Sequence, residues 1–162
     1  MDSIFQRLVQ TNFSELPGLT VDASIPVSER LINELVTVAM QQNPSITSCR
    51  VSIEPQNRLD LHLKTSIWPW PLNLKLKLFG SMDFTYSPTV RAFLENHVLL
   101  AKMGALLKAL PPGITIFRDQ VSMDVEALIT DPEQKRLLSL IKTVDIKTET
   151  GKLILSVKIN TE

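Results

Sequence analysis

The segment Thr65–Pro88, TSIWPWPLNLKLKLFGSMDFTYSP, decides the predicted fold because its pattern changes in the middle. Near its start, tryptophan and proline alternate twice, and proline has no amide hydrogen to donate to a β-ladder. The chain is therefore expected to leave the sheet at Trp68–Pro71, in a turn or at an edge. Further along, Leu72–Leu78 alternates leucine with polar residues, and Met82–Tyr86 keeps the same parity. This pattern predicts one strand of about 15 residues, longer than most strands.

Two interpretations of Trp68 and Trp70 are open from the sequence. Indole rings on such a turn can close the end of a packed core. They can equally lie at the mouth of a cavity and contact a lipid interface, where an amphipathic ring is favoured.

Alternation of apolar and polar residues also predicts strands on both sides of this segment. The predicted strand and hairpin regions are 19–25, 46–54 with 59–67, 114–117 with 121–125, and 144–148 with 153–159. The turns between paired regions contain Pro55–Arg58, Arg118–Gln120 and Glu149–Gly151, which are rich in turn-forming residues.

Helical spacing predicts short helices at residues 2–13, from Ser28 to about Gln42, and from Asp131 to about Ile141. Ser28 is a good N-cap for the second of these helices. The apolar residues of this helix form one stripe, whereas Glu29, Arg30, Asn33 and Glu34 are expected to lie on the opposite, solvent-facing side. The helix is therefore expected to cover part of the core.

The segment that follows Pro88, TVRAFLENHVLLAKMGALLKALPPG, is predicted to form one long helix from residue 88 to residue 110. From Val98 to Leu110 only Lys102 and Lys108 are charged, and a helix that is apolar on nearly every side must be enclosed. At 1.5 Å per residue it would measure roughly 33 Å, comparable to the width of a sheet of six or seven strands.

These elements predict an α+β fold in which a strongly twisted antiparallel sheet curls around one long apolar helix, with additional short helices. The 162 residues fit a single domain, 1–162, with an N-terminal helical segment at 1–18 and a sheet-and-helix core at 19–160.

Composition excludes several classes of function. Lys plus Arg and Asp plus Glu both number 17, so the formal net charge is zero and no nucleic-acid partner is expected. Cys49 is the only cysteine, which rules out an internal disulfide, and its register with Val51 and Ile53 favours a buried, inert thiol. Without an apparent signal peptide or a long uncharged apolar run, a cytoplasmic location is expected.

The succession of SIPVSERLINELV, long amphipathic strands and a very apolar segment resembles the tubular lipid-binding superfamily, which includes the bactericidal/permeability-increasing protein and small bacterial relatives. The phrase GITIFRDQVSMDVEAL, residues 113–128, is similar to segments of those bacterial proteins. The resemblance covers residues 19–159 and implies a non-enzymatic domain that holds a lipid or another amphiphile between the long helix and the concave sheet face.

Residues with catalytic potential form no recognisable constellation. Neither His62 nor His97 lies in a metal or nucleophile motif, so no enzyme activity, cofactor or metal is predicted. Asp119, Asp124 and Glu126 could meet as paired carboxylates, but their loop and strand positions favour solvated side chains.

Binding of a lipid or another apolar small molecule is thus the leading hypothesis. The cavity is predicted to be lined by Leu74, Leu76, Phe84, Leu99, Met103, Leu106 and Leu107, with Trp68 and Trp70 at its mouth. Lys64, Lys75 and Lys77 either keep a solvated sheet face soluble or support a peripheral membrane contact. The alternative function is a protein-interaction or structural module with a fully packed core, such as a homodimer.

Overall fold

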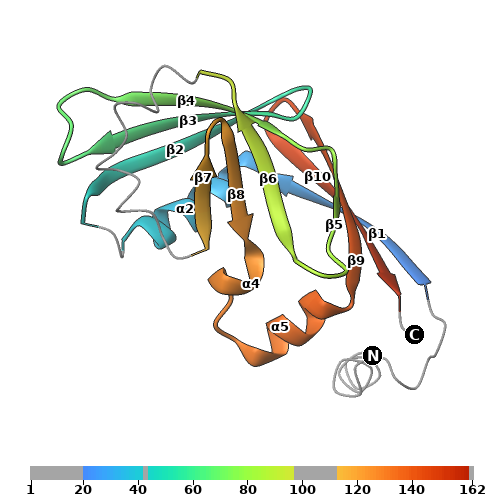
Figure 1. The fold of residues 1–162 in the computed structure, drawn as a ribbon. Helices are drawn as coiled ribbons and strands as arrows, with labels where there is room; N and C mark the ends of the chain where they lie inside the picture. The colour runs from blue at the N-terminus through green and yellow to red at the C-terminus, as the bar shows by residue number, and fades with distance from the viewer. Residues whose placement is uncertain (1–19, 42–43, 97–112, 161–162) are drawn as a thin grey trace.

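The computed structural model describes residues 20–41, 44–96 and 113–160. The described residues form two antiparallel sheets that share one core (Figure 1). The four-stranded sheet has the order β1 (Thr20–Ser28), β10 (Lys152–Asn160), β9 (Ile141–Glu149) and β5 (Ser81–Asp83). The six-stranded sheet has the order β2 (Ile46–Glu54), β3 (Arg58–Thr65), β4 (Leu72–Leu78), β6 (Thr89–Leu94), β8 (Gln120–Asp124) and β7 (Ile114–Phe117).

Three short helices connect these strands in the described ranges of the chain. They are α2 (Glu29–Met40), α4 (Val125–Leu128) and α5 (Pro132–Ser139). Each helix begins at a side-chain cap: the Ser28 hydroxyl accepts from the N–H of Leu31, and the Asp124 and Asp131 carboxylates accept from N–H groups of the first turns of α4 and α5. None of the helices in these ranges is long and apolar enough to cross a membrane.

The predicted fold, with a sheet curled around a long apolar helix, is wrong in its central element. Residues 89–94, expected to open that helix, form strand β6 between β4 and β8. Over these six residues Val90, Ala92 and Leu94 alternate with more exposed neighbours, and a β-branched pair at Thr89 and Val90 favours the extended backbone. The remaining stretch of the predicted helix, from residue 97 to residue 110, lies outside the described residues.

The single long strand predicted for residues 72–86 is also wrong, because the chain changes sheets in the middle of it. β4 ends at Leu78 in the six-stranded sheet, and β5 begins at Ser81 in the four-stranded sheet. Gly80 lies at the change, where its carbonyl accepts from the N–H of Ile146 at 2.7 Å. A Cβ at this position would lie 3.3 Å from Nδ2 of Asn57, so the close approach favours glycine.

Other strands and turns agree with the predictions. The hairpins β2–β3, β7–β8 and β9–β10 pair across the expected turns. The turn residues Gln56, Asn57, Arg118 and Gly151 have positive φ, as tight hairpin connections require. The helix predicted at residues 2–13 lies outside the described residues.

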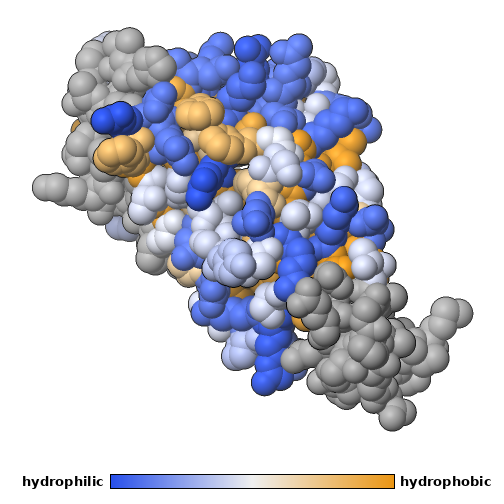
Figure 2. Space-filling view, turned by 45° about the vertical axis from the view of Figure 1, so that its right-hand side comes forward, coloured by the Kyte–Doolittle hydropathy of each residue, from blue (hydrophilic) through white to orange (hydrophobic). Residues whose placement is uncertain are grey.

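The main core lies where the two sheets meet. It joins Ile53, Leu78 and Ala92 of the six-stranded sheet to Met82, Val144, Ile146, Leu153 and Val157 of the four-stranded sheet. A second cluster, formed by Leu63, Leu72, Leu74 and Leu94, lies within the six-stranded sheet. Outward positions are mostly polar, and on the face seen in Figure 2 hydrophilic residues surround small hydrophobic areas.

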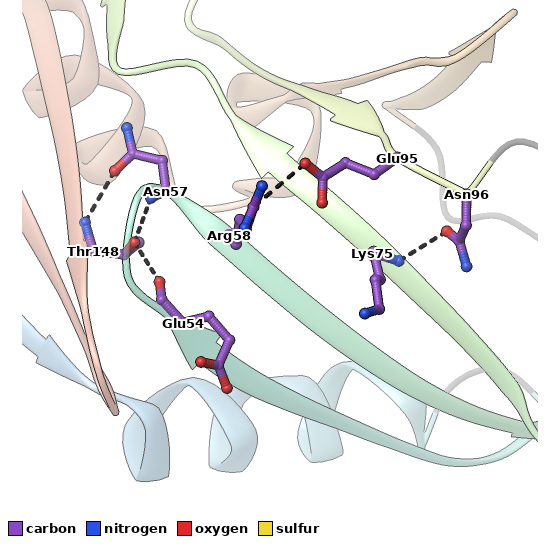
Figure 3. A network of polar contacts seen from close by, with 7 residues as sticks. All are labelled: Glu54, Asn57, Arg58, Lys75, Glu95, Asn96 and Thr148. Carbon is purple, nitrogen blue, oxygen red and sulfur yellow. Dashed lines mark hydrogen bonds and ion pairs between the residues drawn. The ribbon is translucent and has the colours of Figure 1, made fainter.

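The β2–β3 turn fastens the two sheets together (Figure 3). The backbone N–H of Asn57 donates to Oγ1 of Thr148 at 2.6 Å, and the N–H of Thr148 donates to Oδ1 of Asn57 at 3.0 Å. Thr148 Oγ1 in turn donates to the carbonyl of Glu54 at 2.6 Å. Because Thr148 is only 3% exposed, these bonds replace water at groups that would otherwise be buried without partners.

Candidate ligand-binding groove

Helix α2 is fixed along the outer edge of β2 by polar side chains. The N–H of Val51 donates to Oδ1 of Asn33 at 2.7 Å, and Nδ2 of Asn33 donates to the carbonyl of Val51 at 2.8 Å. One turn before Asn33, Oε2 of Glu29 accepts from the N–H of Ile53 at 2.8 Å. These contacts satisfy backbone groups of an edge strand that would otherwise be open to pairing with another chain.

This role of Glu29 and Asn33 differs from the prediction, which placed both residues on the solvent-facing side of the helix. The role was missed because it depends on β2 being an edge strand with free backbone groups. The order of strands in a sheet shows this, and no local sequence pattern predicts that order. The i, i+4 spacing puts Glu29 and Asn33 on the same side of the helix, but it indicates a contact with β2 only once β2 is known to lie beside α2.

The apolar stripe of α2 is only partly covered. Ile32 packs against the main core, whereas Leu31, Leu35 and Val38 are 44%, 60% and 61% exposed. Three large aliphatic side chains at i, i+4 and i+7 therefore form an accessible row that continues the core outward. The expectation that this helix covers part of the core is correct for the side of the stripe that contains Ile32, whereas the side with Leu31, Leu35 and Val38 is exposed.

On its other side α2 borders a groove of about 730 Å³ against β2. The groove is lined by Glu29, Arg30, Asn33, Glu34, Thr37, Val38, Cys49 and Arg50. Arg30 and Glu34 form an exposed ion pair at 3.3 Å, and Arg50 is exposed on β2. Val38 belongs both to the groove and to the apolar row, so the polar and apolar surfaces meet at this residue.

Cys49 contributes a half-buried thiol to the groove. Burial raises the pKa of this thiol above its ordinary value, because the thiolate loses hydration. The predicted buried position is wrong, since the thiol is half-buried and lines the groove, while the raised pKa favours its neutral form.

Three of the residues predicted to line a cavity lie within the part of the chain that the structure describes, and all three belong to the packed core. Phe84 is buried in the main cluster and Leu74 in the second cluster, and Leu76 packs against both. None of the three lines the groove beside α2. The other four predicted lining residues, Leu99, Met103, Leu106 and Leu107, lie outside the described residues.

Two of the residues considered for catalysis, Asp124 and His62, make hydrogen bonds within the fold. Asp124 caps α4 by accepting from the N–H groups of Glu126 and Ala127. Nδ1 of His62 is hydrogen-bonded to Oδ1 of Asn73 at 2.7 Å on the exposed sheet face. Within residues 20–41, 44–96 and 113–160, no three His, Cys, Asp or Glu side chains gather in a way that could hold a metal ion.

Replacing Asn33 with alanine should lower the free energy of unfolding by about 1–2 kcal/mol, because the backbone of Val51 loses both its partners. It should also raise the tendency to aggregate, since the edge of β2 becomes open. Urea denaturation and light scattering measure these two effects. The matched control is Glu34→Ala on the exposed side of the helix, and equal behaviour of the two variants would contradict the role of Asn33.

Comparison with known proteins assigns no family to this chain: no family model matches it, and neither a curated protein nor a solved structure does.

Proposed function

We propose that the chain is a non-catalytic binding domain for a lipid or another amphipathic small molecule, held along α2. The observation that carries this proposal is the junction at Val38, where an exposed aliphatic row borders a groove with charged walls. An amphiphile combines the same features, an apolar chain and a polar group. The chain would cover Leu31, Leu35 and Val38, and the polar group would lie near Arg30 and Arg50.

The dimensions of this surface suit a short length of acyl chain. From Leu31 to Val38 the helix rises about 10 Å, at 1.5 Å per residue. Each methylene removed from water there would contribute about 0.8 kcal/mol. This placement replaces the expectation of a ligand between the sheet and a helix at residues 88–110, since β6 occupies the start of that segment.

The proposal predicts that Leu35→Asp weakens binding of a dansyl-labelled fatty acid by at least about tenfold, because a carboxylate would be desolvated beside the acyl chain. Leu35 is mostly exposed, so the free energy of unfolding should change by only about 0.5 kcal/mol. Fluorescence titration measures binding, and native mass spectrometry of both purified proteins shows whether lipid is retained.

The matched control is Phe117→Asp, which changes a similarly exposed apolar residue at the end of β7 and should leave binding intact. Wild-type protein that neither retains lipid nor binds the probe would contradict the proposal. Equal loss of binding in both variants would do the same.

A protein-interaction module is the second candidate function, because the described inner face of the sheets is closely packed by its own side chains. In that case the row on α2 would contact another protein, such as a second copy of the chain. Sedimentation analysis would then find a ligand-free dimer that Leu35→Asp converts to a monomer.

A further inference from the structure

The loop that joins β3 to β4 presents an exposed apolar and aromatic surface. Trp70 is 70% exposed, Ile67 51% and Trp68 37%, and these three residues lie within four positions of one another. The loop lies at the end of the six-stranded sheet that is remote from β9 and β10 (Figure 1). Trp70 therefore closes no core, and the interpretation of both tryptophans as an interior plug does not hold for it.

The structure holds this loop in place with its apolar residues outward. The N–H of Trp68 donates to Oγ1 of Thr65 at 3.1 Å, and the N–H of Ser66 donates to the carbonyl of Ser45 at 3.0 Å, beside the start of β2. Pro69 and Pro71 fix two further backbone torsions. The indoles are thus presented by a constrained backbone, so little conformational entropy opposes their insertion into another phase.

The charged residues near the loop are mainly basic, although Asp60 lies opposite Lys75 on β3 and the N–H of Glu95 donates to the carbonyl of Lys75. From Leu61 to Met82 the chain contains no Asp or Glu, although it carries Lys64, Lys75 and Lys77. Lys64 is the penultimate residue of β3, directly before the loop, and Lys75 is the fourth residue of β4 after it. Residues 61–82, which include the loop, therefore carry an excess of positive charge.

We infer that the β3–β4 loop is a docking site for an anionic lipid bilayer. Ile67, Trp68 and Trp70 enter the region between headgroups and acyl chains, where indole is favoured. Lys64 and Lys75 remain at the level of the anionic headgroups, which attract them. The charge complementarity and the paired indoles favour a bilayer surface over an apolar protein partner. This inference is independent of the ligand site on α2.

The chain reports on this contact by itself, because its two tryptophans both lie in the loop. The full-length protein is titrated with vesicles of phosphatidylcholine alone and with vesicles that also contain phosphatidylglycerol. The anionic vesicles should shift the tryptophan emission to shorter wavelength, and lipids brominated near the headgroup should quench it. Salt should weaken the binding, since it screens the lysines.

Variants identify the residues responsible. Trp70→Ala keeps Trp68 as a reporter and should lower the partition coefficient by about tenfold, since it removes most of the exposed aromatic surface. Lys64→Gln should lower it by about fivefold on anionic vesicles and leave the weak binding to neutral vesicles unchanged. Tyr86→Ala is the matched control, because Tyr86 is an almost fully exposed aromatic residue outside the loop, and it should bind as the wild type does.

Three results would overturn the inference. The first is unchanged tryptophan emission with anionic vesicles. The second is vesicle binding that Trp70→Ala leaves intact, which would place the contact elsewhere. The third is an emission shift that depends on protein concentration without lipid, since a second copy would then cover the indoles. Leu35→Asp should still bind vesicles, so failure of the ligand proposal and failure of this one are distinguishable.

Discussion

Truncation of Ile53 to alanine should lower the free energy of unfolding by about 3–4 kcal/mol. Ile53 is only 1% exposed and lies in the cluster that joins the two sheets. Strand β3 and helix α2 fix its backbone, so the surroundings cannot collapse easily into the space left by the missing atoms. Urea denaturation followed by circular dichroism measures the change.

Two further substitutions calibrate this result. Ile53→Val removes one methylene and should cost about 1 kcal/mol. Ile25→Ala removes the same atoms as Ile53→Ala, but from a half-exposed position on β1, and should cost about 1 kcal/mol or less. If Ile53→Ala proved no more harmful than Ile25→Ala, the packing of the two sheets at this position would be refuted.

Replacement of Thr148 with valine should lower the free energy of unfolding by about 2–4 kcal/mol, although the two side chains have nearly the same shape. The hydroxyl accepts from the N–H of Asn57 and donates to the carbonyl of Glu54 (Figure 3). Valine would leave both groups without this partner at a buried site. The effect is measured by urea denaturation with the variant and the wild type at the same pH.

The control for Thr148→Val is Thr115→Val, which makes the same change at an exposed position of β7 and should alter stability by only about 0.5 kcal/mol. A double-mutant cycle with Asn57→Gly tests the connection between the turn and β9, because glycine tolerates the positive φ of 61° but lacks the side-chain amide. Strictly additive effects would show that the two residues do not act together.

The sequence predicts elements whose signals are local. Ser28 and Asp131 begin helices as N-caps, and the turns at residues 55–58 and 149–151 connect hairpins as expected. The two errors both come from signals that are ambiguous over a short length. Six residues, Thr89–Leu94, fit a helical and an alternating pattern about equally well, and Ser87–Pro88 suits a cap as well as an approach to a strand.

The parity of Leu72–Tyr86 predicted one strand because a change of sheet at Phe79–Gly80 preserves the alternation. Only the contact of Gly80 with Asn57 and Ile146, distant in sequence, distinguishes the two arrangements. The candidate site was less predictable still. Leu35 and Val38 on α2 and Trp70 in the β3–β4 loop are exposed because no other element that the structure describes packs over them. Which elements pack together depends on contacts between residues distant in sequence, so a local pattern does not predict this exposure.

The change of sheet at Gly80 has a consequence for how the chain acquires its structure. In chain order the strands belong to the four-stranded sheet (β1), the six-stranded sheet (β2–β4), the four-stranded sheet (β5), the six-stranded sheet (β6–β8) and again the four-stranded sheet (β9 and β10). Strand β1 pairs with β10 from Thr20↔Asn160 to Ser28↔Lys152. Neither sheet can be completed from one continuous piece of chain. High contact order of this kind is associated with slow, cooperative folding, over milliseconds to seconds for small domains. The β1–β10 pairing should therefore be among the last to form, and neither half of the chain should fold when expressed alone.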